Sequence, residues 1–570
     1  MSSNIEHLSP MEESDDLSKY TFIKYARDNY REGSPSSHTR GSLQKPLHLQ
    51  DNEHNYEAAL TIFHVIQRFM FDLPEPTDSM PDEEDNVFLR TLARNSDFGE
   101  GTFKRKIDSV KMPGWTSIPH LSSMSKPTTN MEKVRFICSY GIYCQELRDE
   151  IYSQICMQLT NNPSKTSTSR GWIILAVCLG CFPPSEKFIN YLRNFLRQGP
   201  EGYAEFCENK LMRTMAIGCR KLAPASLELG AAKMEGKIMI PIITMDSKTY
   251  EFEVDSSTTC EELLKDFQSK LGLKNIFGFS VFAKQFEEVF NWGCGSDCIM
   301  DLISLCEQYA IYKHVSEEER HNWTIFVRKD VFLSSHNAAS DPVETNLIYW
   351  QIMGGIHVGE YHCTDNNELA ELLAKRYYVE YGKIMTDENL GNIVENGGPP
   401  NQDYQQHMEL THLVQTKFQS TASIVSLSES GMSKIDVVNL ACSKKAWQKD
   451  FSRIFNANLI SGPKLPKGPV RLFFHSGGVD LLSTKKKSKG AFFLNILFEH
   501  IASITNDSPE YMKIKGGRFD TSNYLTIRTY EKSTYTFSSP GAKDMYKLGH
   551  TLLEDYKRGD PTLADVYNSP

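Results

Sequence analysis

The sequence is 570 residues long, which is too much for one hydrophobic core, and typical domain sizes divide it into roughly three to five domains. Its formal charge of -10 argues against a general nucleic-acid binder, because such proteins carry a basic excess. The 13 cysteines are spread too widely for the disulfide framework of a small secreted protein, so we expect free thiols in a reducing cytosol.

The sequence predicts neither a targeting segment nor a membrane span. The first residues, MSSNIEHLSPMEESDDLSKY, lack the basic start and the apolar run of a signal peptide, and residues 1–16 are expected to be disordered. The most apolar segment, Trp172 to Phe182, falls far short of the roughly 20 residues that cross a bilayer. We therefore expect a cytoplasmic protein that is not exported.

Residues 17–225 show the apolar spacing that is typical of helices. One stripe, which precedes Pro74, consists of Ala59, Ile62, Phe63, Ile66, Phe69 and Met70. In LRDEIYSQICMQL an apolar residue recurs every fourth position from Leu147 to Leu159, so this face is expected to be buried. The run GWIILAVCLGCFPP is apolar all round, which is typical of a central helix. These signals predict a compact helical bundle, interrupted by a polar surface insertion at about 75–130.

A different pattern begins after Pro224. Over residues 236–318 a turn is expected at Asp246 and Ser247, between two strands whose alternating apolar residues are Ile238, Ile240, Ile242, Tyr250, Phe252 and Val254. A helix is expected to open between Ser257 and Thr259. A hairpin that leads into a helix is the start of a ubiquitin-like lobe.

The remainder divides into a helical part and a part rich in strands. Helical signals return over residues 319–448, although the period breaks at ENGGPPNQDYQQH. Over residues 449–560 the expected strands are RIFNANLI, VRLFFHS, VDLLST, AFFLNILF, YLTIRTY and STYTFSS. A final helix, GAKDMYKLGHTLLEDYKRG, follows them, and residues 561–570 form a tail. Strands followed by one helix predict a small barrel plugged by that helix, as in pleckstrin-homology folds.

The order ubiquitin-like, helical, then barrel with helix is that of a FERM domain. The preceding half carries LRDEIYSQICMQLTNNP, RGWIILAVCLGCFPPSEKFINYLRNFL and CENKLMRT, and it closely resembles the MyTH4 domain. Further segments, such as GPEGYAEFCENKLMRT and TNLIYWQIMGGIHVGEYHC, look most like the first MyTH4-FERM unit of class VII unconventional myosins. The resemblance runs from about Asp16 to Asp560.

This resemblance implies a multi-domain α+β fold. An all-α MyTH4 bundle would precede three FERM lobes, which are ubiquitin-like, helical like acyl-CoA-binding protein, and pleckstrin-homology-like with a C-terminal helix. The sequence departs from the family at about 395–435, where NGGPP and SLSESG interrupt the helical lobe. The SH3-like segment that usually follows this unit is not found after Asp560, so the chain is read as a fragment.

The sequence predicts no catalytic or metal site. The neighbours Asp149 and Glu150 would point about 100° apart on a helix, so they could not flank one substrate bond. Neither a G-x-x-x-x-G-K-[ST] loop nor a G-x-S-x-G elbow occurs. The C-x-x-C pair at Cys178 lacks a second such pair, and His407 and His412 would diverge on a helix. We therefore expect no enzyme activity, no catalytic residue, no cofactor and no metal.

Basic side chains on the helical bundle are the first candidate binding surface. Because the apolar stripe turns inward, we expect Arg148 and Glu150 to project outward. The following helices would add the cations Lys187, Arg193, Arg197, Lys210 and Arg213. Arginines in a rigid array hold carboxylates through paired hydrogen bonds, which suits acidic peptides or acidic filament surfaces, and the resemblance implies such partners. The alternative is an ordinary solvated face.

Two further candidate surfaces lie in the last lobe. The loop STKKKSKG places Lys485, Lys486, Lys487 and Lys489 between two strands, where they would attract anionic phospholipid or simply keep a hairpin soluble. The resemblance implies a peptide groove beside the strand before the last helix, with candidate residues Ile501, Ile504, Met545 and Leu548. The alternative for these apolar residues is the core.

The function predicted from these features is binding without catalysis. The chain would be a cargo-binding tail module of an unconventional myosin that links an actin-based motor to adaptor or receptor-tail peptides at actin-rich protrusions or the cell cortex. It would contact actin only indirectly, and it would bind no nucleic acid. The alternatives are a linker without a motor between anionic membrane and cytoskeleton, and attachment to microtubules through the basic bundle face. The short link CRKLAPASLELG predicts that the two halves dock rigidly.

Overall fold

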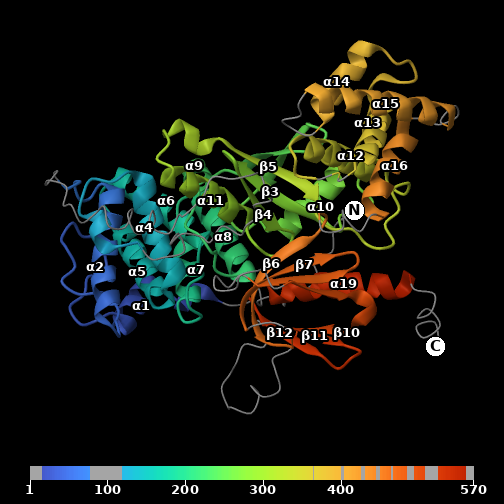
Figure 1. Cartoon of the computed structure of the whole chain (residues 1–570). Coiled ribbons are helices and arrows are strands. Elements are labelled where there is room, and N and C mark those ends of the chain that lie inside the picture. Colours follow the sequence, from blue (N-terminus) through green and yellow to red (C-terminus); the bar gives the residue numbers. More distant parts are fainter. Residues whose placement is uncertain are drawn as a thin grey trace.

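The structure, a computed structural model of the chain, describes residues 16–76, 119–361, 363, 365–398, 404–424, 430–443, 450–463, 467–483, 493–506 and 524–559. In chain order these form a helical bundle, a first sheet lobe, a helical lobe and a second sheet lobe (Figure 1). Figure 1 shows the bundle on the left, the first sheet lobe in the centre, the helical lobe at the upper right and the second sheet lobe below. The predicted fold class is confirmed. The predicted N-terminal segment, polar insertion and C-terminal tail lie wholly or largely outside the described residues.

The helical bundle is built around helices that are buried on every side. Its helices are α1 (Phe22–Asn29), α2 (Glu53–Met70), α4 (Asn130–Tyr143), α5 (Arg148–Leu159), α6 (Lys165–Leu179), α7 (Ile189–Arg197), α8 (Tyr203–Ile217) and α9 (Ser226–Met234). The predicted stripe of α2 is buried, and α6 is the central helix that its apolar run indicated. Helix α9 lies beyond the predicted end of the bundle at residue 225, yet its Leu229 and Ala232 pack into the bundle core.

The first sheet lobe begins with the predicted hairpin. Its elements are β1 (Ile238–Ile243), β2 (Thr249–Val254), α10 (Cys260–Leu271), β3 (Phe279–Gln285), β4 (Glu288–Gly293), α11 (Ile299–Tyr312) and β5 (Trp323–Lys329). The sheet order is β2-β1-β5-β3-β4. Helix α10 opens with a capping box between Thr259 and Glu262, which fixes its start after the hairpin. The predicted lobe end at residue 318 is wrong, because β5 lies between β1 and β3 in the middle of this sheet.

The helical lobe consists of α12 (Pro342–His357), α13 (Asn366–Tyr381), α14 (Asp387–Gly397), α15 (Tyr404–Ile424) and α16 (Ser430–Ser443). Helix α12 starts with Asp341 as its N-cap and Pro342 in the first turn, as helix starts often do. The predicted break at ENGGPPNQDYQQH separates α14 from α15. The interval from 395 to 435, which the resemblance left open, is largely taken up by α15 and the start of α16.

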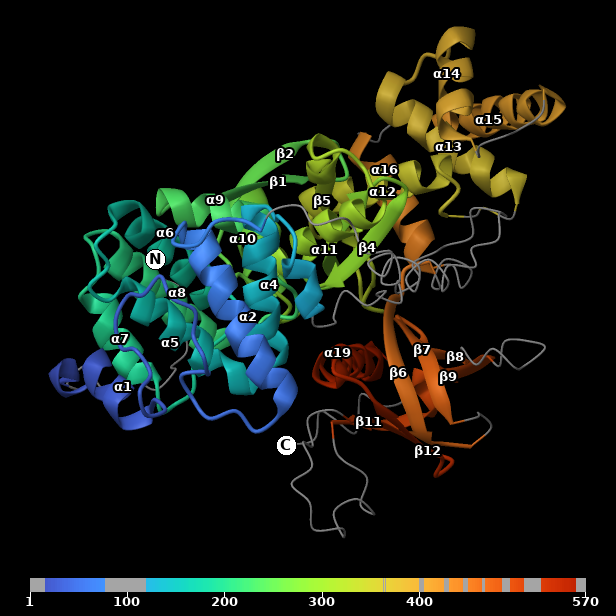
Figure 2. The same ribbon diagram turned by 90° about the vertical axis from the view of Figure 1, so that its left-hand side faces the viewer.

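The second sheet lobe contains the six predicted strands and the final helix, and it adds the strand β10, which the predicted set lacked. Its elements are β6 (Arg453–Ser461), β7 (Gly468–His475), β8 (Gly478–Ser483), β9 (Phe493–Leu497), β10 (Ile501–Thr505), β11 (Tyr524–Thr529), β12 (Thr534–Ser538) and α19 (Ala542–Gly559). The described strands follow the order β10-β11-β12-β6-β7-β8-β9. Helix α19 packs against β10, β11 and β7, and Figure 2 shows it alongside this sheet. Its apolar face closes the core of the lobe.

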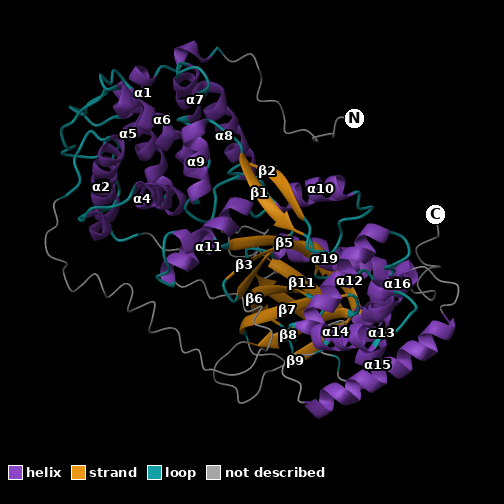
Figure 3. Cartoon of the chain, turned by 90° about the horizontal axis from the view of Figure 1, so that it is seen from above, coloured by secondary structure: helices purple, strands orange, loops and turns teal. Residues whose placement is uncertain are grey.

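The short segment after β5 connects the two sheet lobes and the helical lobe. Asp330 forms an ion pair with Arg453 at the start of β6, with 2.6 Å between Oδ1 and Nη2. Val331 enters the core of the second sheet lobe, whereas the next residue, Phe332, enters the core of the helical lobe. In Figure 3 the strands of both sheets lie in the middle of the molecule, with helices on either side.

Candidate partner-binding surfaces

The first turn of α5 faces the interior of the bundle. Glu150 is only 1% exposed. Its carboxylate accepts hydrogen bonds from the backbone N–H groups of Leu47 and His48, each at 2.8 Å, and it lies 2.8 Å from His48 Nδ1. The prediction that Glu150 projects outward is wrong, because the loop between α1 and α2 folds over the polar side of this helix. Apolar periodicity within one helix gives no signal for such a distant loop.

The guanidinium of Arg148 binds backbone carbonyls of the bundle. Its Nε donates to the carbonyl oxygen of Gly141 at 2.8 Å, and its Nη2 donates to that of Ile142 at 3.3 Å. These carbonyls belong to the last turn of α4, where backbone acceptors lack partners within the helix. Arg148 therefore closes the end of α4, and the expectation of an outward guanidinium is corrected.

The neighbouring acid Asp149 turns to a different part of the bundle. Its carboxylate accepts hydrogen bonds from the backbone N–H of Ser185 at 2.9 Å and from the Ser185 hydroxyl at 2.5 Å. Glu150 accepts from Leu47 and His48, so the two carboxylates have separate partners. The prediction that these acids point apart is confirmed, and both are occupied in holding loops.

Three of the predicted cations do lie on the bundle surface. Lys187 is exposed in the turn before α7. Arg193 and Arg197 of α7 share one carboxylate, that of Glu208 on α8, with Nη2 to Oε1 distances of 3.2 and 3.1 Å. One carboxylate between two guanidinium groups leaves a net positive charge at this spot. Lys187 and the half-exposed Arg197 are thus the accessible part of the predicted basic array.

Lys210 and Arg213 lie between the bundle and the first sheet lobe. Lys210 is 8% exposed, and its Nζ donates to Ser256 Oγ at 2.9 Å. Arg213 makes a paired contact with Glu262 at 2.7 and 2.9 Å and a further contact with Asp255 at 3.1 Å. The hydrogen bonds that Arg213 donates to Glu262 contribute most to raising the pKa of Arg213. The expectation that both cations are free on the surface is wrong, because the second lobe buries Lys210 and pairs the partly exposed Arg213 with two acids.

A buried charge cluster extends this contact between the two halves. Arg220 contacts Glu228 and lies 2.9 Å from Asp301 Oδ1, and all three side chains are 1% exposed. Burial opposes the positive charge, but Glu228 and Asp301 hold the pKa of Arg220 above its usual value. Arg135 reaches Glu307 of α11 at 2.6 Å, and Ser226 also donates to Glu307. The two halves are therefore docked, as the short link predicted.

The predicted groove residues of the second sheet lobe lie in its core. Ile501, Ile504, Met545 and Leu548 are all buried. Helix α19 sits close to the sheet at Gly549, where an added Cβ would be 2.8 Å from Phe474 Cε1 and 3.0 Å from Ile504 Cδ1. These four side chains therefore cannot line an open groove, and two further strands, β11 and β12, separate β10 from α19 in the chain.

The backbone edge of β10 is the remaining candidate for the predicted peptide site. In the described part of the sheet β10 pairs with β11 alone. Its pairing shifts register between Ile501 and Ser503, and Lys557 Nζ donates to the carbonyl oxygen of Ala502 at 3.3 Å. A short, irregular edge that is partly covered by a lysine discourages indiscriminate pairing. The lysines 485, 486, 487 and 489 lie outside the described residues.

The cysteine pair that the sequence singled out lies in the core of the bundle. Cys178 and Cys181 are buried, Cys178 Sγ lies 3.9 Å from Cys138 Sγ, and burial raises the pKa of the Cys181 thiol well above its usual value. Among the described residues, acids, histidines and cysteines do not gather in a group that could hold a metal ion. Within the same residues, each helix is too short or too polar to cross a bilayer.

The matches to domain families divide the chain close to the lobe boundaries of the structure. The MyTH4 domain model matches residues 134–231, the RA like domain model matches residues 236–331, and the model of the Myosin-X FERM PH domain-like family matches residues 451–558. The first match runs from within α4 to most of α9, the second covers the first sheet lobe including β5, and the third covers the second sheet lobe.

Whole-chain comparisons give similar relatives. Myosin-VIIa of Drosophila melanogaster is 34% identical over 605 residues, which cover 97% of this chain and 27% of that protein, so the chain spans about a quarter of this relative. The Dictyostelium discoideum Myosin VII MyTH4-FERM MF1 domain has a TM-score of 0.61 at 18% identity over 96% of this chain and 99% of that one. The human Myosin 7b C-terminal MyTH4-FERM domain, solved in complex with the harmonin-a PDZ3 domain, has a TM-score of 0.58 at 18% identity over 97% and 99%.

Proposed function

Because this chain belongs to the MyTH4-FERM proteins and is related to class VII myosins, we propose that it is a non-catalytic tail module that binds adaptor or receptor-tail peptides. It would thereby connect an actin-based motor to its cargo. The observation that carries this proposal is the likeness to myosin-VIIa along 97% of the chain. A related human MyTH4-FERM domain has been solved with the PDZ3 domain of harmonin-a, which supports an adaptor protein as the kind of partner.

The surface that we propose for acidic partner segments is smaller than the sequence suggested. It comprises Lys187 and Arg197, with Arg193 behind them, because Arg148, Lys210 and Arg213 are engaged elsewhere. A guanidinium that shares its carboxylate with a second guanidinium keeps donors available for an incoming acid. The edge of β10 that does not pair with β11 is the proposed site for backbone pairing with a partner strand. We place the module in the cytoplasm, on the cytoskeleton at actin-rich protrusions or the cell cortex.

The test measures peptide binding by the full chain. A panel of adaptor segments and adhesion-receptor tail peptides is screened by fluorescence polarisation, and the tightest binder is then taken into hydrogen exchange. We expect protection in both the helical bundle and the sheet lobes. Reversing two exposed charges, Lys187→Glu with Arg197→Glu, should weaken an acidic peptide about tenfold, since charge reversal at a rim removes complementarity.

The matched control reverses one exposed lysine on another lobe, Lys313→Glu, and should leave the affinity unchanged. A panel without any binder, or a binder that protects neither half, would contradict the proposal. Turnover of ATP by the purified chain would contradict its non-catalytic character.

A second candidate function is a linker between anionic membrane and cytoskeleton. It is favoured by the four lysines between β8 and β9, since each basic residue near an anionic surface contributes about 1 kcal/mol. Liposome pelleting with and without phosphoinositides distinguishes this candidate from peptide binding. Reversing these lysines should abolish pelleting at low salt and leave peptide affinity intact. Co-sedimentation with microtubules tests the remaining candidate, attachment through the bundle cations.

A further inference from the structure

Two connections lie side by side where the first sheet lobe, the helical lobe and the second sheet lobe meet. Residues 330–332 leave the first sheet lobe after β5, and residues 451–453 lead from the helical lobe into β6. They run in opposite directions, because the start of each connection contacts the end of the other. We call this pair of connections the clasp.

A buried ion pair closes the polar end of the clasp. The side chains of Asp330 and Arg453 are each 7% exposed, and Asp330 Oδ1 lies 2.6 Å from Arg453 Nη2. Arg453 also donates to the carbonyl oxygen of Phe279 at 3.3 Å, and Ser280 Oγ donates to Asp330 at 2.7 Å. Since Phe279 and Ser280 belong to β3, this end ties the first sheet lobe to the second.

An aromatic contact closes the other end of the clasp. Phe332 and Phe451 are 3% and 2% exposed, and their ring centres are 4.7 Å apart. The ring of Tyr361 lies 5.2 Å from that of Phe451, and all three rings belong to the core of the helical lobe. The helical lobe is thus packed around both connections at the points where they reach it.

Neighbouring residues of the clasp lie in different cores. Val331 is buried in the core of the second sheet lobe, whereas the next residue, Phe332, is buried in the core of the helical lobe. Gly278, which precedes β3, leaves no room behind this segment, because an added Cβ there would lie 2.0 Å from the Val331 carbonyl oxygen. Close-packed cores transmit strain, so moving Phe332 out of the helical lobe would pull on Val331 within the second sheet lobe.

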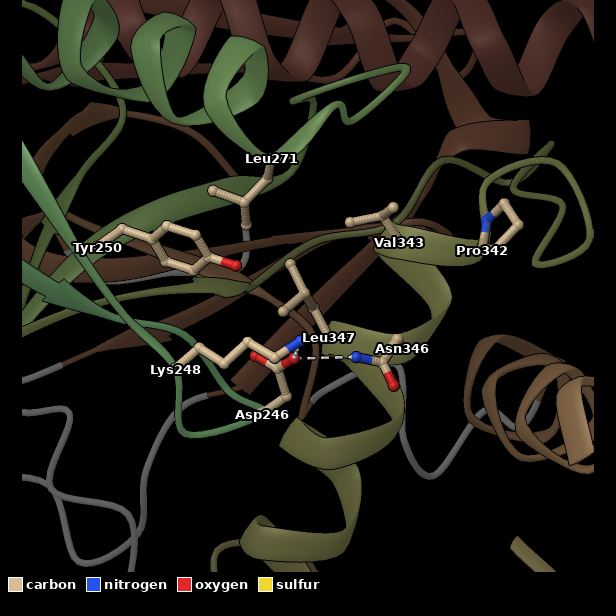
Figure 4. Close-up of a pocket in the computed structure, with 8 residues that line it drawn as sticks. All are labelled: Asp246, Lys248, Tyr250, Leu271, Pro342, Val343, Asn346 and Leu347. Atoms are coloured by element: carbon tan, nitrogen blue, oxygen red, sulfur yellow. Dashed lines mark hydrogen bonds and ion pairs between the residues drawn. The ribbon is translucent and has the colours of Figure 1, made fainter.

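The helical lobe meets the first sheet lobe less closely away from the clasp. A pocket of about 320 Å³ lies there between the β1–β2 turn, the end of α10 and the first turns of α12 (Figure 4). Asn346 of α12 donates to Asp246 of the turn at 3.2 Å, but Val343, which also lines the pocket, is 37% exposed. An open space offers no partner atoms for packing, so the clasp is the tighter of these two contacts.

We propose that the clasp couples the helical lobe to the second sheet lobe, so that the two lobes open as one cooperative unit. Each connection is anchored in both lobes, and the two connections hold each other at both ends. Opening of either lobe would break one end of the clasp and thereby loosen the other lobe. A partner that stabilises one lobe therefore stabilises the other, whichever surface it uses. The coupling belongs to the chain without a partner, so it does not depend on the proposed function.

Native-state hydrogen exchange of the full chain, without any partner, tests the coupling. The variant is Phe418→Leu, which changes a buried ring of α15 that lies against Tyr377 of α13 in the core of the helical lobe. We expect protection to fall about tenfold in α13 and α15, as for a typical core substitution, and by a similar factor in β6, β7 and α19. Loss of protection confined to the helical lobe would overturn the proposal.

The matched control makes the same substitution in the core of the bundle. Phe63→Leu should lower protection in the bundle and leave the helical lobe and the second sheet lobe unchanged. A fall of protection in the second sheet lobe of this control would show that the whole chain opens together. That result would overturn the role of the clasp.

A second pair of chains opens the polar end of the clasp. Asp330→Asn with Arg453→Gln replaces the buried ion pair by two neutral amides, so that neither charge is left buried alone. Adding Phe418→Leu to this chain should still lower protection in α13 and α15. Its effect in β6, β7 and α19 should shrink to about twofold or less, as for sites that are independent. Full transfer of the effect would overturn the proposal, because the lobes would then be coupled elsewhere.

Discussion

The first sheet lobe contacts the bundle on one side and the helical lobe on the other, and the two contacts differ in the partners of their charged side chains. Toward the bundle, Arg220 lies between Glu228 and Asp301, and each carboxylate has further backbone donors. Toward the helical lobe, Lys329 pairs with Glu344 at 2.5 Å, and Lys434 donates to the neutral amide of Asn346 at 2.8 Å. The contact with the bundle is therefore held by paired charges, whereas the contact with the helical lobe also depends on the neutral amides of Gln351 and Asn346.

The largest effect is expected at the contact with the bundle, from Arg220→Met. This change leaves Glu228 and Asp301 buried without their cation, and breaking a buried pair from one side costs about 3–5 kcal/mol. Hydrogen exchange should show loss of protection in α9 and α11, together with a lower urea midpoint. The control is Arg197→Met, where the guanidinium is half exposed and Arg193 still reaches Glu208, so less than about 1 kcal/mol is expected. Equal losses in both variants would refute the distinction.

A smaller effect is expected at the contact with the helical lobe, from Gln351→Ala. The amide of Gln351 accepts from the backbone N–H of Lys329 at 2.8 Å and donates to its carbonyl oxygen at 2.6 Å. Alanine would leave both buried groups without a partner, at about 2–3 kcal/mol. Exchange should increase at the end of β5 and in α12, while the bundle stays protected. Gln308→Ala removes a half-buried amide from α11 and serves as the control. Loss of protection in the bundle would show that the two contacts are not independent.

Local patterns in the sequence were sufficient for most secondary structure. The alternation of Ile238, Ile240 and Ile242 gave β1 correctly, because a strand with one buried face repeats every second residue. Strand β5 was assigned to the wrong lobe for a physical reason. It follows α11 in the chain but pairs with β1 and β3, and sequence order does not encode that neighbourhood.

The candidate site was harder to predict than the fold. Lys210 and Arg213 have the same residue type and helical spacing as surface cations, and only the docking of a second lobe buries Lys210 and gives Arg213 its acid partners. Glu150 was misplaced in the same way, by a loop about a hundred residues earlier in the chain. The pocket at Asp246 and Asn346 gave no signal at all, since its sides come from separate lobes. Charged residues are thus the positions where periodicity within one element is least informative.

The smallest effect concerns Glu262, which joins α10 to Arg213 of the bundle. Burial alone would raise the pKa of Glu262, but hydrogen bonds from Arg213 and from Thr259 outweigh it, so this pKa lies below the usual 4.5. A carboxyl with a lowered folded-state pKa stabilises the protein above its unfolded pKa, and this contribution is lost as the pH falls through the folded-state pKa.

The test compares Glu262→Gln with the parent chain in urea at neutral pH and at steps below pH 4.5. The parent should be more stable by less than about 1 kcal/mol at neutral pH, because the pair is partly exposed, and the difference should vanish in acid. Glu261→Gln is the control, since Glu261 faces Lys265 on the same helix and not the bundle. A difference for Glu262→Gln that persists in acid would mean that its charge does not hold the bundle, and that the buried cluster around Arg220 supplies the electrostatic part of this contact alone.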